Sequence, residues 1–299
     1  GLYGNRILVL NNYIKHGFQN WGDDHAPEIN ISSVDRISVL KGSAGVRFGP
    51  EALGGAIIVE PDQMKLRQPY FLDVNAGYQS NGRGTNYSIK TGKGFKNLGF
   101  NLGLNYINIG DRHSPSYYLT NSGKKEKGIN LGLHYHLKNL DIKLYYNFID
   151  LNLALLRSSI FHSGNAISRA MISDVPLIIE PFSFKIREPS QLINHHFTKA
   201  KIDWYYSENK KISLIAGRQL NKRKEFDVRR NSELPIIDLD LVSTDLMLEW
   251  DHSISDNSEG LIGLNFFNQD NDNLPGTQTT PFIPNYNTNR YSLFLIESL

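Results

Sequence analysis

The residues with the clearest potential for chemistry lie in the stretch from Trp21 to Glu28, which reads WGDDHAPE. Asp24 and His25 offer a carboxylate oxygen and an imidazole nitrogen, which together suit a borderline divalent metal. Nine histidines in 299 residues would also scatter by chance, and Asp and His are common in loops, so the alternative is a loop without a metal. Further candidate metal ligands are His113, His162, His195 and His196.

Other chemistry has little support in the sequence. Cysteine is absent, which excludes disulfides, thiolate metal clusters and a thiol nucleophile. No phosphate-binding P-loop, HExxH or GxSxG motif occurs. The 32 Lys+Arg and 30 Asp+Glu residues leave a net charge of +2, without the basic excess that phosphate contacts require, so no nucleic-acid partner is predicted.

From about residue 70 onward, apolar and polar residues alternate strictly, as at Ile142, Leu144, Tyr146 and Phe148. A period of two with one apolar face predicts strands whose two faces meet different media. About ten such segments of roughly ten residues follow one another, close to the ~9–11 residues of a tilted membrane-spanning strand.

The connections between these segments alternate in length. Outer-membrane barrels have tight turns at one end and long loops at the other. The sequence therefore predicts an all-β dominated fold, an antiparallel transmembrane β-barrel, with a water-soluble β-sandwich as the alternative. Short connections lie near 96–97, 138–139, 207–211 and 253–259, and long ones at 111–127, 151–193, 224–238 and 270–287, while 80–84 breaks the order.

Residues 1–61 have a different pattern. Apolar runs at 7–10, 34–40 and 56–59 predict short buried strands. Five glycines within residues 42–55 imply backbone at positive φ or close approach of chain segments. We expect a small mixed α/β region ahead of the strand region at 67–299.

Residues 34–61, VDRISVLKGSAGVRFGPEALGGAIIVEP, resemble the end of the plug domain of TonB-dependent outer-membrane receptors. That family typically reads V/I-E-R-I-E-V-L-K/R-G-P and then Y-G-x-x-A-x-G-G-V-I-N-I. The upstream run GNRILVLNN resembles the plug strand V-L-V-L-I-D-G, with Asn11 for the usual Asp. Matching positions are Arg36, Lys41, Gly42, Phe48, Gly49, Ala52, Gly54 and Gly55; Asp35, Ser43 and Phe48 replace the usual Glu, Pro and Tyr.

The resemblance implies the second half of a plug domain at 1–61 and the first part of a barrel of about 22 strands at 67–299. An energy-coupling box, the first plug half and further strands would be missing, so we expect a truncated reading frame, a gene fragment or one piece of a split protein. It also implies a bacterial outer-membrane receptor that is not an enzyme and has no resident cofactor. Such a receptor would import a metal, metal chelate, siderophore or haem with energy from the TonB complex.

The same resemblance assigns roles to particular residues. The loop of Trp21, Asp23, Asp24, His25 and Glu28 takes the place of the ligand-binding plug apex. Its D-H-A stretch is similar to the plug loop of a subgroup associated with zinc and other transition metals. Arg36 and Lys41 fall where the family faces barrel carboxylates, so Glu249 is the expected partner, with Asp245 and Asp251 as further candidates; ordinary solvation of these charges is the alternative.

Two other classes of function remain open. A non-transporting surface-binding protein or receptor remnant would share the fold, whereas an outer-membrane enzyme would need an outward-facing Ser/His or Asp/His site, and we find none. The long connection 151–193 contains the apolar stretch Val175–Phe182, which is unusual for a solvated loop. It would fold onto the plug or bind a surface lipoprotein.

Overall fold

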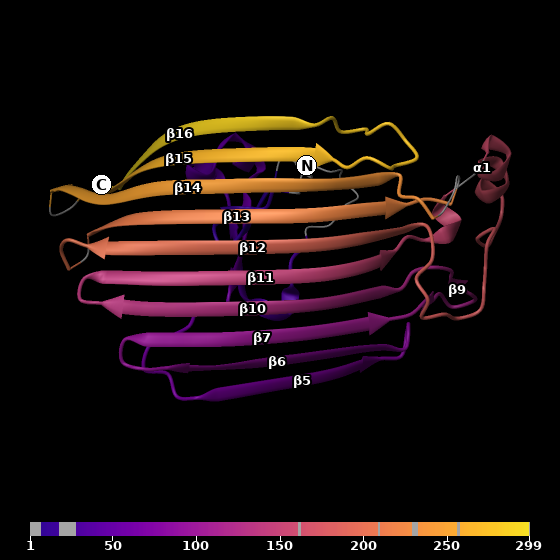
Figure 1. Cartoon of the computed structure of the whole chain (residues 1–299), viewed down its shortest axis with the longest axis horizontal. Coiled ribbons are helices and arrows are strands. Elements are labelled where there is room, and N and C mark those ends of the chain that lie inside the picture. Colours follow the sequence, from indigo (N-terminus) through magenta and orange to yellow (C-terminus); the bar gives the residue numbers. More distant parts are fainter. Residues whose placement is uncertain are drawn as a thin grey trace.

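The structure, a computed structural model, describes residues 7–17, 28–160, 163–208, 210–228, 233–255 and 258–298. Ten strands lie side by side in one antiparallel sheet, which we call the wall (Figure 1). Its strands are neighbours in chain order, and β5 and β16 form its two edges. They are β5 (Phe71–Gln79), β6 (Gly84–Gly94), β7 (Leu98–Ile109), β10 (Lys124–Leu137), β11 (Leu140–Ala154), β12 (Ser190–Tyr205), β13 (Lys211–Phe226), β14 (Ile237–Ser255), β15 (Ser258–Asn273) and β16 (Tyr286–Ser298).

A four-stranded sheet, which we call the plug sheet, lies against one face of the wall (Figure 1). Its order is β2-β1-β4-β3, with β1 and β4 parallel and the other pairs antiparallel. The three expected strands are present, and a fourth, β2, is added. The elements are β1 (Leu8–Asn11), β2 (Ile14–Lys15), β3 (Val34–Leu40), β4 (Ala56–Pro61) and the 3-10 helices η2 (Ile31–Ser33), η3 (Gly42–Phe48) and η4 (Pro50–Gly54).

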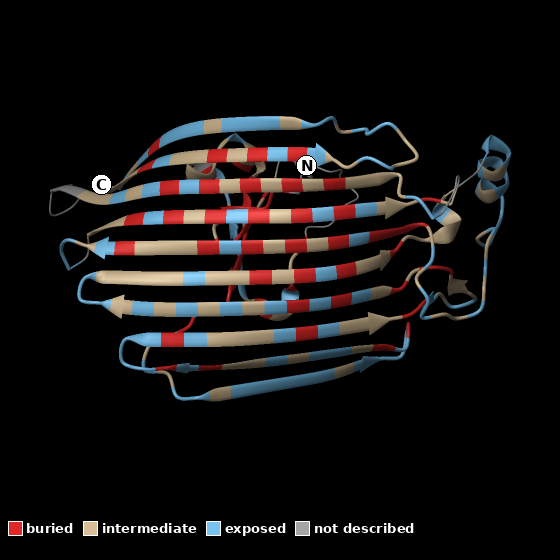
Figure 2. Ribbon diagram, viewed as in Figure 1, coloured by how far each residue is buried: buried red, intermediate tan, exposed pale blue. Residues whose placement is uncertain are grey.

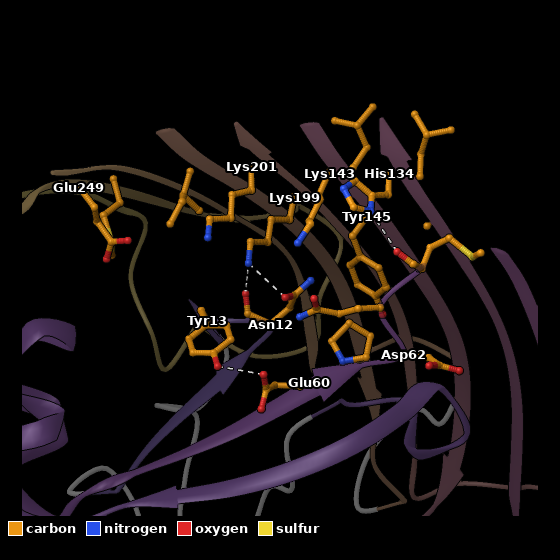
Figure 3. Close-up of a pocket in the computed structure, with 18 of the residues that line it drawn as sticks. Asn12, Tyr13, Glu60, Asp62, His134, Lys143, Tyr145, Lys199, Lys201 and Glu249 are labelled. Atoms are coloured by element: carbon orange, nitrogen blue, oxygen red, sulfur yellow. Dashed lines mark hydrogen bonds between the residues drawn. The ribbon is translucent and has the colours of Figure 1, made fainter. Parts of the chain in front are cut away.

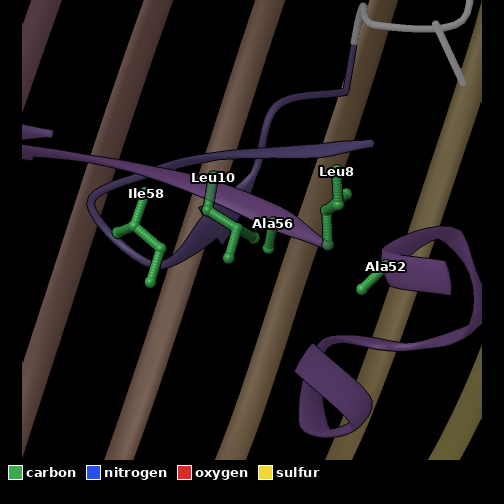
Figure 4. Close-up of a cluster of buried hydrophobic side chains, with 5 residues drawn as sticks. All are labelled: Leu8, Leu10, Ala52, Ala56 and Ile58. Atoms are coloured by element: carbon green, nitrogen blue, oxygen red, sulfur yellow. The ribbon is translucent and has the colours of Figure 1, made fainter. Parts of the chain in front are cut away.

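The plug sheet has an apolar core of its own (Figure 4). Leu8 and Leu10 are alternate residues of β1, so they share a face, and in the parallel register they pair with Ala56 and Ile58 of β4. Ala52 of η4 covers this group. The glycine-rich segment therefore closes one side of the plug core.

A second apolar cluster joins the plug sheet to the wall. Ile14 of β2 is 1% exposed and packs directly against the wall. The wall makes room at Gly217, where an added Cβ would lie 2.9 Å from three atoms of Ile14. Burying an aliphatic side chain completely is worth about 1.5–3 kcal/mol, so this contact holds the two sheets together. Its wall partners are Phe197, Ile215, Met247 and Phe294.

The two faces of the wall differ, as the alternation predicts. Burial alternates along the central strands in Figure 2, because every second residue there faces the plug sheet, whereas the edge strands β5 and β16 are exposed along most of their length. On β14, for example, Met247 is buried while Leu246 and Leu248 are exposed on the other side, the outer face. Large apolar side chains on the outer face form a band across the sheet, including Leu104, Leu131, Leu144, Leu214, Leu246, Leu248, Leu264 and Leu293.

The central strands are longer than expected. β11 to β15 have 15 to 19 residues, beyond the roughly ten of the predicted segments. Toward the long loops their outer face becomes polar, at positions such as Asp150, Lys222 and Asp270. The alternation in the sequence identifies only the part of each strand that lies in the apolar band, whereas hydrogen bonding between the strand backbones continues beyond this band. Chain segments expected to be loop therefore belong to strands.

The long connections lie at one end of the wall and the short turns at the other, except for the short turn between β5 and β6, which lies at the long-loop end (Figure 1). The long-loop end carries β8 (Arg112–His113), β9 (Tyr118–Leu119), η5 (Arg157–Ser159) and α1 (Gly164–Met171). Within the described residues no helix is both long and apolar enough to cross a membrane.

The apolar stretch 175–182 packs on a neighbouring loop. Phe182 packs against Tyr118 and under the guanidinium of Arg83, and the Glu180 backbone N–H donates to Thr120 Oγ1 at 2.8 Å. Its described contacts are thus with the long-loop end of the wall, and the plug sheet is not among them.

Candidate functional site

Glu28 is the one residue of the expected apex loop that the structure describes. Its side chain is almost completely buried, and its carboxylate contacts the guanidinium of Arg223 on β13. It also lies 3.3 Å from Nε2 of His16. Glu28 therefore connects the plug region to the wall. The other apex residues and one candidate metal ligand lie outside the described residues: Trp21, Asp23, Asp24, His25 and His162.

The surroundings of Glu28 favour its ionised form. Burial by itself would raise the pKa of this carboxyl group, because an ionised carboxylate loses its hydration there. The hydrogen bond with His16 and the positive charge of Arg223 outweigh burial and lower the pKa of Glu28 to about 2. The ion pair with Arg223 thus persists at any physiological pH.

The three described histidines among the candidate metal ligands lie apart. His195 is fully buried on the inner face, with its ring centroid 5.5 Å from that of His16. His196, the next residue of β12, points to the outer face and is 2.8 Å from the hydroxyl of Tyr146. His113 lies in β8 at the long-loop end. Adjacent strand residues face opposite sides, so His195 and His196 do not converge on one ion.

Across the ranges that the structure describes, no group of three or more His, Asp or Glu side chains is arranged to hold a metal ion. The metal-binding role of Asp24 and His25 stays a prediction, because both residues fall in the stretch 18–27.

Arg36 has a different partner from the expected one. Its guanidinium binds the Glu60 carboxylate through two hydrogen bonds, of 2.7 and 2.8 Å, within the plug sheet. Arg36 and Glu60 are directly opposite in the β3–β4 register, so the nearest carboxylate is local. The bond from Arg36 holds the pKa of Glu60 below its ordinary value. Lys41 is exposed, and Glu249 lines a cavity that Arg36 also lines (Figure 3).

Ion pairs between plug and wall are present with the opposite polarity. The expectation put the cation on the plug and the carboxylate on the wall; instead, Glu28 pairs with Arg223 and Glu51 of η4 with Arg290 of β16. Glu51 also binds Lys15 Nζ at 2.6 Å. Burial of Glu51 would raise its pKa, but Lys15 and Arg290 lower it to about 2. Both carboxylates are therefore ionised at the interface.

Wall side chains also bind the backbone of the plug region. Gln219 Nε2 donates to the Lys15 carbonyl oxygen at 2.7 Å, and Gln269 Nε2 donates to that of Gly17 at 3.0 Å. Lys199 Nζ donates to the Asn12 carbonyl oxygen at 2.5 Å. Each such bond contributes about 0.5–1.5 kcal/mol, or more where the donor is charged. These backbone contacts are thus individually modest and add to the apolar contact of Ile14 and the two ion pairs.

The plug motif has the backbone role that its glycines suggested. Gly42, Gly49 and Gly55 have φ of +67°, +99° and +112°, a backbone conformation that L-residues with a side chain rarely adopt. A Cβ at Gly55 would also lie 2.6 Å from the Leu40 carbonyl oxygen. Gly54 ends η4, and Phe48 packs against the plug core.

Sequence reasoning missed the wall residues that bind the plug region. The signal was present on β13, where the positions opposite the apolar outer face read Ser213, Ile215, Gly217, Gln219, Asn221 and Arg223, polar or small at all but Ile215. A mostly polar face of this kind meets water or a polar partner. The pattern does not identify the partner of this face, because Glu28 and Arg223 are 195 residues apart in the sequence.

Comparisons with known proteins agree with this arrangement. Residues 1–56 match the family described as TonB-dependent Receptor Plug Domain. Among curated proteins no sequence match is found. The ferric citrate transporter FecA in its unliganded form superimposes with a TM-score of 0.72 and 12% identity, over 99% of this chain and 46% of FecA.

Two receptors from Pseudomonas aeruginosa have the same fold. The siderophore receptor PirA gives a TM-score of 0.65 and 11% identity, over 98% of this chain and 45% of PirA. A mutant of the ferric enterobactin receptor PfeA gives 0.70 and 12%, over 98% and 47%. This chain spans less than half the length of these proteins. Residues 1–56 thus match the TonB-dependent receptor plug-domain family, and the wall on which this region packs has the fold of siderophore-receptor barrels.

Proposed function

We propose that this protein is an outer-membrane receptor that takes up a metal, metal chelate, siderophore or haem, with energy from the TonB complex. The observation that supports it most is the division of the wall into an apolar outer face and an inner face that binds a plug domain. A membrane location explains the exposed apolar band, and a plugged lumen explains the polar inner face.

The dimensions of the apolar band support the membrane part of the proposal. On β14 the outer-face residues from Val242 to Trp250 lie eight residue steps apart, and only Thr244 interrupts their apolar series. At ~3.3 Å per residue and a tilt of about 40°, they cover about 20 Å along the membrane normal. Outer-membrane barrels have apolar bands about 25 Å tall. The outer lipid is therefore the expected partner of this face.

Aromatic residues border this band at the short-turn end. Trp204 and Tyr206 lie near the end of β12, and Trp250 Nε1 donates to the Tyr206 hydroxyl at 3.0 Å. Amphipathic aromatic rings at this position are typical of the membrane–water interface. We assign the short-turn end to the periplasmic side and the long loops to the outside, where a surface lipoprotein would meet them.

The cargo is proposed by analogy with the matched proteins. PirA is named as a siderophore receptor, PfeA as a ferric enterobactin receptor and FecA as a ferric citrate transporter. We infer that this protein likewise acts by binding and import, without catalysis. The second candidate is a surface-binding protein without transport, because the plug–wall contacts would also suit a permanently closed receptor.

A matched pair of variants tests membrane insertion. Leu264 lies within the band on β15, opposite Leu248, whereas Asp272 lies on the same face beyond the band, opposite Asp240. Leu264→Lys should cost about 2–4 kcal/mol of insertion into phosphatidylcholine vesicles, and Asp272→Lys less than ~1 kcal/mol. Equal insertion of both variants, or a wild-type chain that stays monomeric in buffer without lipid, would contradict a membrane wall.

An uptake assay tests the transport part. Deleting the gene in its own host should reduce uptake of radiolabelled iron offered as siderophore, citrate or haem complex, and an uncoupler should reduce wild-type uptake equally. Surface binding that is lost on deletion while uptake is unchanged would favour the non-transporting alternative.

A further inference from the structure

A cavity of about 440 Å³ lies between the plug region and the wall (Figure 3). It is near the short-turn end, because its wall residues include Lys201 and Lys211, which flank the turn between β12 and β13. On the plug side it is lined by Asn12 and Tyr13, from the turn between β1 and β2, and by residues 60–64. Its volume is in the usual range for a small-molecule site.

Three lysines from two neighbouring strands point into this cavity. Lys143 of β11 is directly opposite Lys201 of β12 in the strand register, and Lys199 lies on the same face two residues away. Figure 3 shows their amino groups directed from the wall toward Asn12. Like charges in adjacent positions repel, so this arrangement costs free energy unless anions lie near.

The lysines differ in their described partners. Lys201 pairs with Asp203 at 3.3 Å. Lys199 is 6% exposed, and its two acceptors, the carbonyl and side-chain oxygens of Asn12, are neutral. Lys143 makes no hydrogen bond or ion pair with any residue that the structure describes. Two ammonium groups in a partly enclosed space thus have no carboxylate in contact.

The carboxylates that line the cavity do not remove this imbalance. Glu60 is engaged by Arg36 and by the hydroxyl of Tyr13. Glu249 lies to one side of the lysines in Figure 3, and Asp62 lies on the other. Asp251 of β14 also lines the cavity, and within the described residues no ion pair joins it to Lys143 or Lys199. A buried cation is stabilised by a charged acceptor more than by neutral ones. The centre of the cavity therefore favours an added anion.

We propose that this cavity binds a small multivalent oxyanion, a di- or tricarboxylate or a phosphate, through Lys143 and Lys199. This proposal rests on the proposed function. In the import pathway, the site would bind anionic cargo on the periplasmic side of the plug. Lysine suits this role because its ammonium is a compact charge on a flexible stem and adapts to carboxylate or phosphate oxygens. The occupant contacts the wall, so it stays bound to the wall when the plug moves.

Calorimetric titration of the full chain in detergent micelles tests the site, with citrate and inorganic phosphate as separate probes. Binding of at least one probe is expected. Lys143→Gln should weaken it about tenfold, since it removes one charge-assisted bond, and Lys143→Arg should retain it within about threefold. Lys127→Gln, on the exposed outer face of β10, is the matched control and should leave affinity unchanged.

Three results would overturn the site: no binding of either probe, equal weakening by Lys143→Gln and Lys127→Gln, or wild-type affinity in Lys143→Gln. Because Lys143 has no described partner, Lys143→Gln should fold as the wild type does, and unchanged near-ultraviolet circular dichroism checks this. Vesicle insertion and uptake are measured separately. Normal insertion and uptake without anion binding would reject the cavity site and leave the receptor function standing.

Discussion

Replacing Arg223 by methionine should loosen the plug from the wall. The change removes the cation that faces the buried carboxylate of Glu28 while keeping a side chain of similar length. His16, 3.3 Å from the carboxylate, remains as a partner. A carboxylate left without its cation in a buried site is costly, because water does not replace the lost interaction.

The size of the effect follows from the protonation of Glu28. Its pKa of about 2, against an ordinary 4.5, corresponds to about 3 kcal/mol of net stabilisation of the ionised group in the folded protein, to which the His16 hydrogen bond and the Arg223 charge both contribute. The expected cost of removing Arg223 alone rests on the general cost of removing one member of a buried ion pair, about 3–5 kcal/mol. Since the folded-state pKa is the lower one, this stabilisation is complete above pH 4.5 and is lost as the pH falls through 2.

Hydrogen–deuterium exchange of the β1 amides in detergent micelles measures plug release. A loss of about 3 kcal/mol should raise their exchange rates about a hundredfold. Lys222→Met is the matched control: the next residue along β13 points outward and pairs with Asp240 at 3.3 Å in an exposed position, worth about 0–1 kcal/mol. Adding Glu28→Gln to Arg223→Met should restore part of the protection.

Equal exchange rates in Arg223→Met and Lys222→Met would contradict a buried ion pair that holds the plug region on the wall. A double variant that exchanges faster than Arg223→Met by the full cost of a second independent substitution would do the same, because no coupling would then exist between Glu28 and Arg223.

Three further outcomes are expected. Gly217→Val should displace Ile14 and cost about 1–3 kcal/mol of plug docking, measured by β2 exchange; unchanged exchange would contradict the packing. Gly55→Ala should destabilise the plug sheet by at least about 1–3 kcal/mol through its φ of +112° and the Leu40 oxygen, read from denaturant exchange profiles, with wild-type profiles as the contrary result. Glu51→Gln should increase β16 exchange between pH 5 and 8 and match wild type below pH 2, because the Glu51 pKa is about 2; equal rates at all pH values would refute this.

The wall could be predicted because the feature that identifies its strands, the alternation of apolar and polar residues, lies within the sequence of each strand. Each strand has one face toward apolar surroundings, so residues such as Leu144 and Tyr146 carry the period of two in the sequence itself. The ends of the strands could be predicted less well. Beyond the apolar band both faces of a strand are polar, and hydrogen bonding between backbones does not depend on residue type. The strands therefore extend into stretches that read as loops.

The partners across the interface were not predictable in the same way. Alternation says which face a side chain takes, but it does not say what lies opposite in a closed structure. Arg36 paired with Glu60 because the β3–β4 register puts them face to face, at a separation of 24 residues. Glu28 and Arg223 meet only after the plug sheet docks on the wall. Electrostatic reasoning identified that such pairs exist, and it assigned their signs to the wrong sides.

The hydrogen bonds from the wall to the main chain of the plug region affect how independently the sequences of these two parts can evolve. The amides of Gln219 and Gln269 and the ammonium of Lys199 donate hydrogen bonds to peptide carbonyl oxygens, which every amino acid has. Substitutions at plug positions 12 and 15 would leave those carbonyl acceptors in place, provided the chain keeps its path, whereas a Cβ at Gly17 would lie 3.1 Å from the donating Gln269 Nε2. Chimeras that combine this wall with a plug of unrelated surface sequence should therefore assemble more readily than chimeras that change the three wall donors.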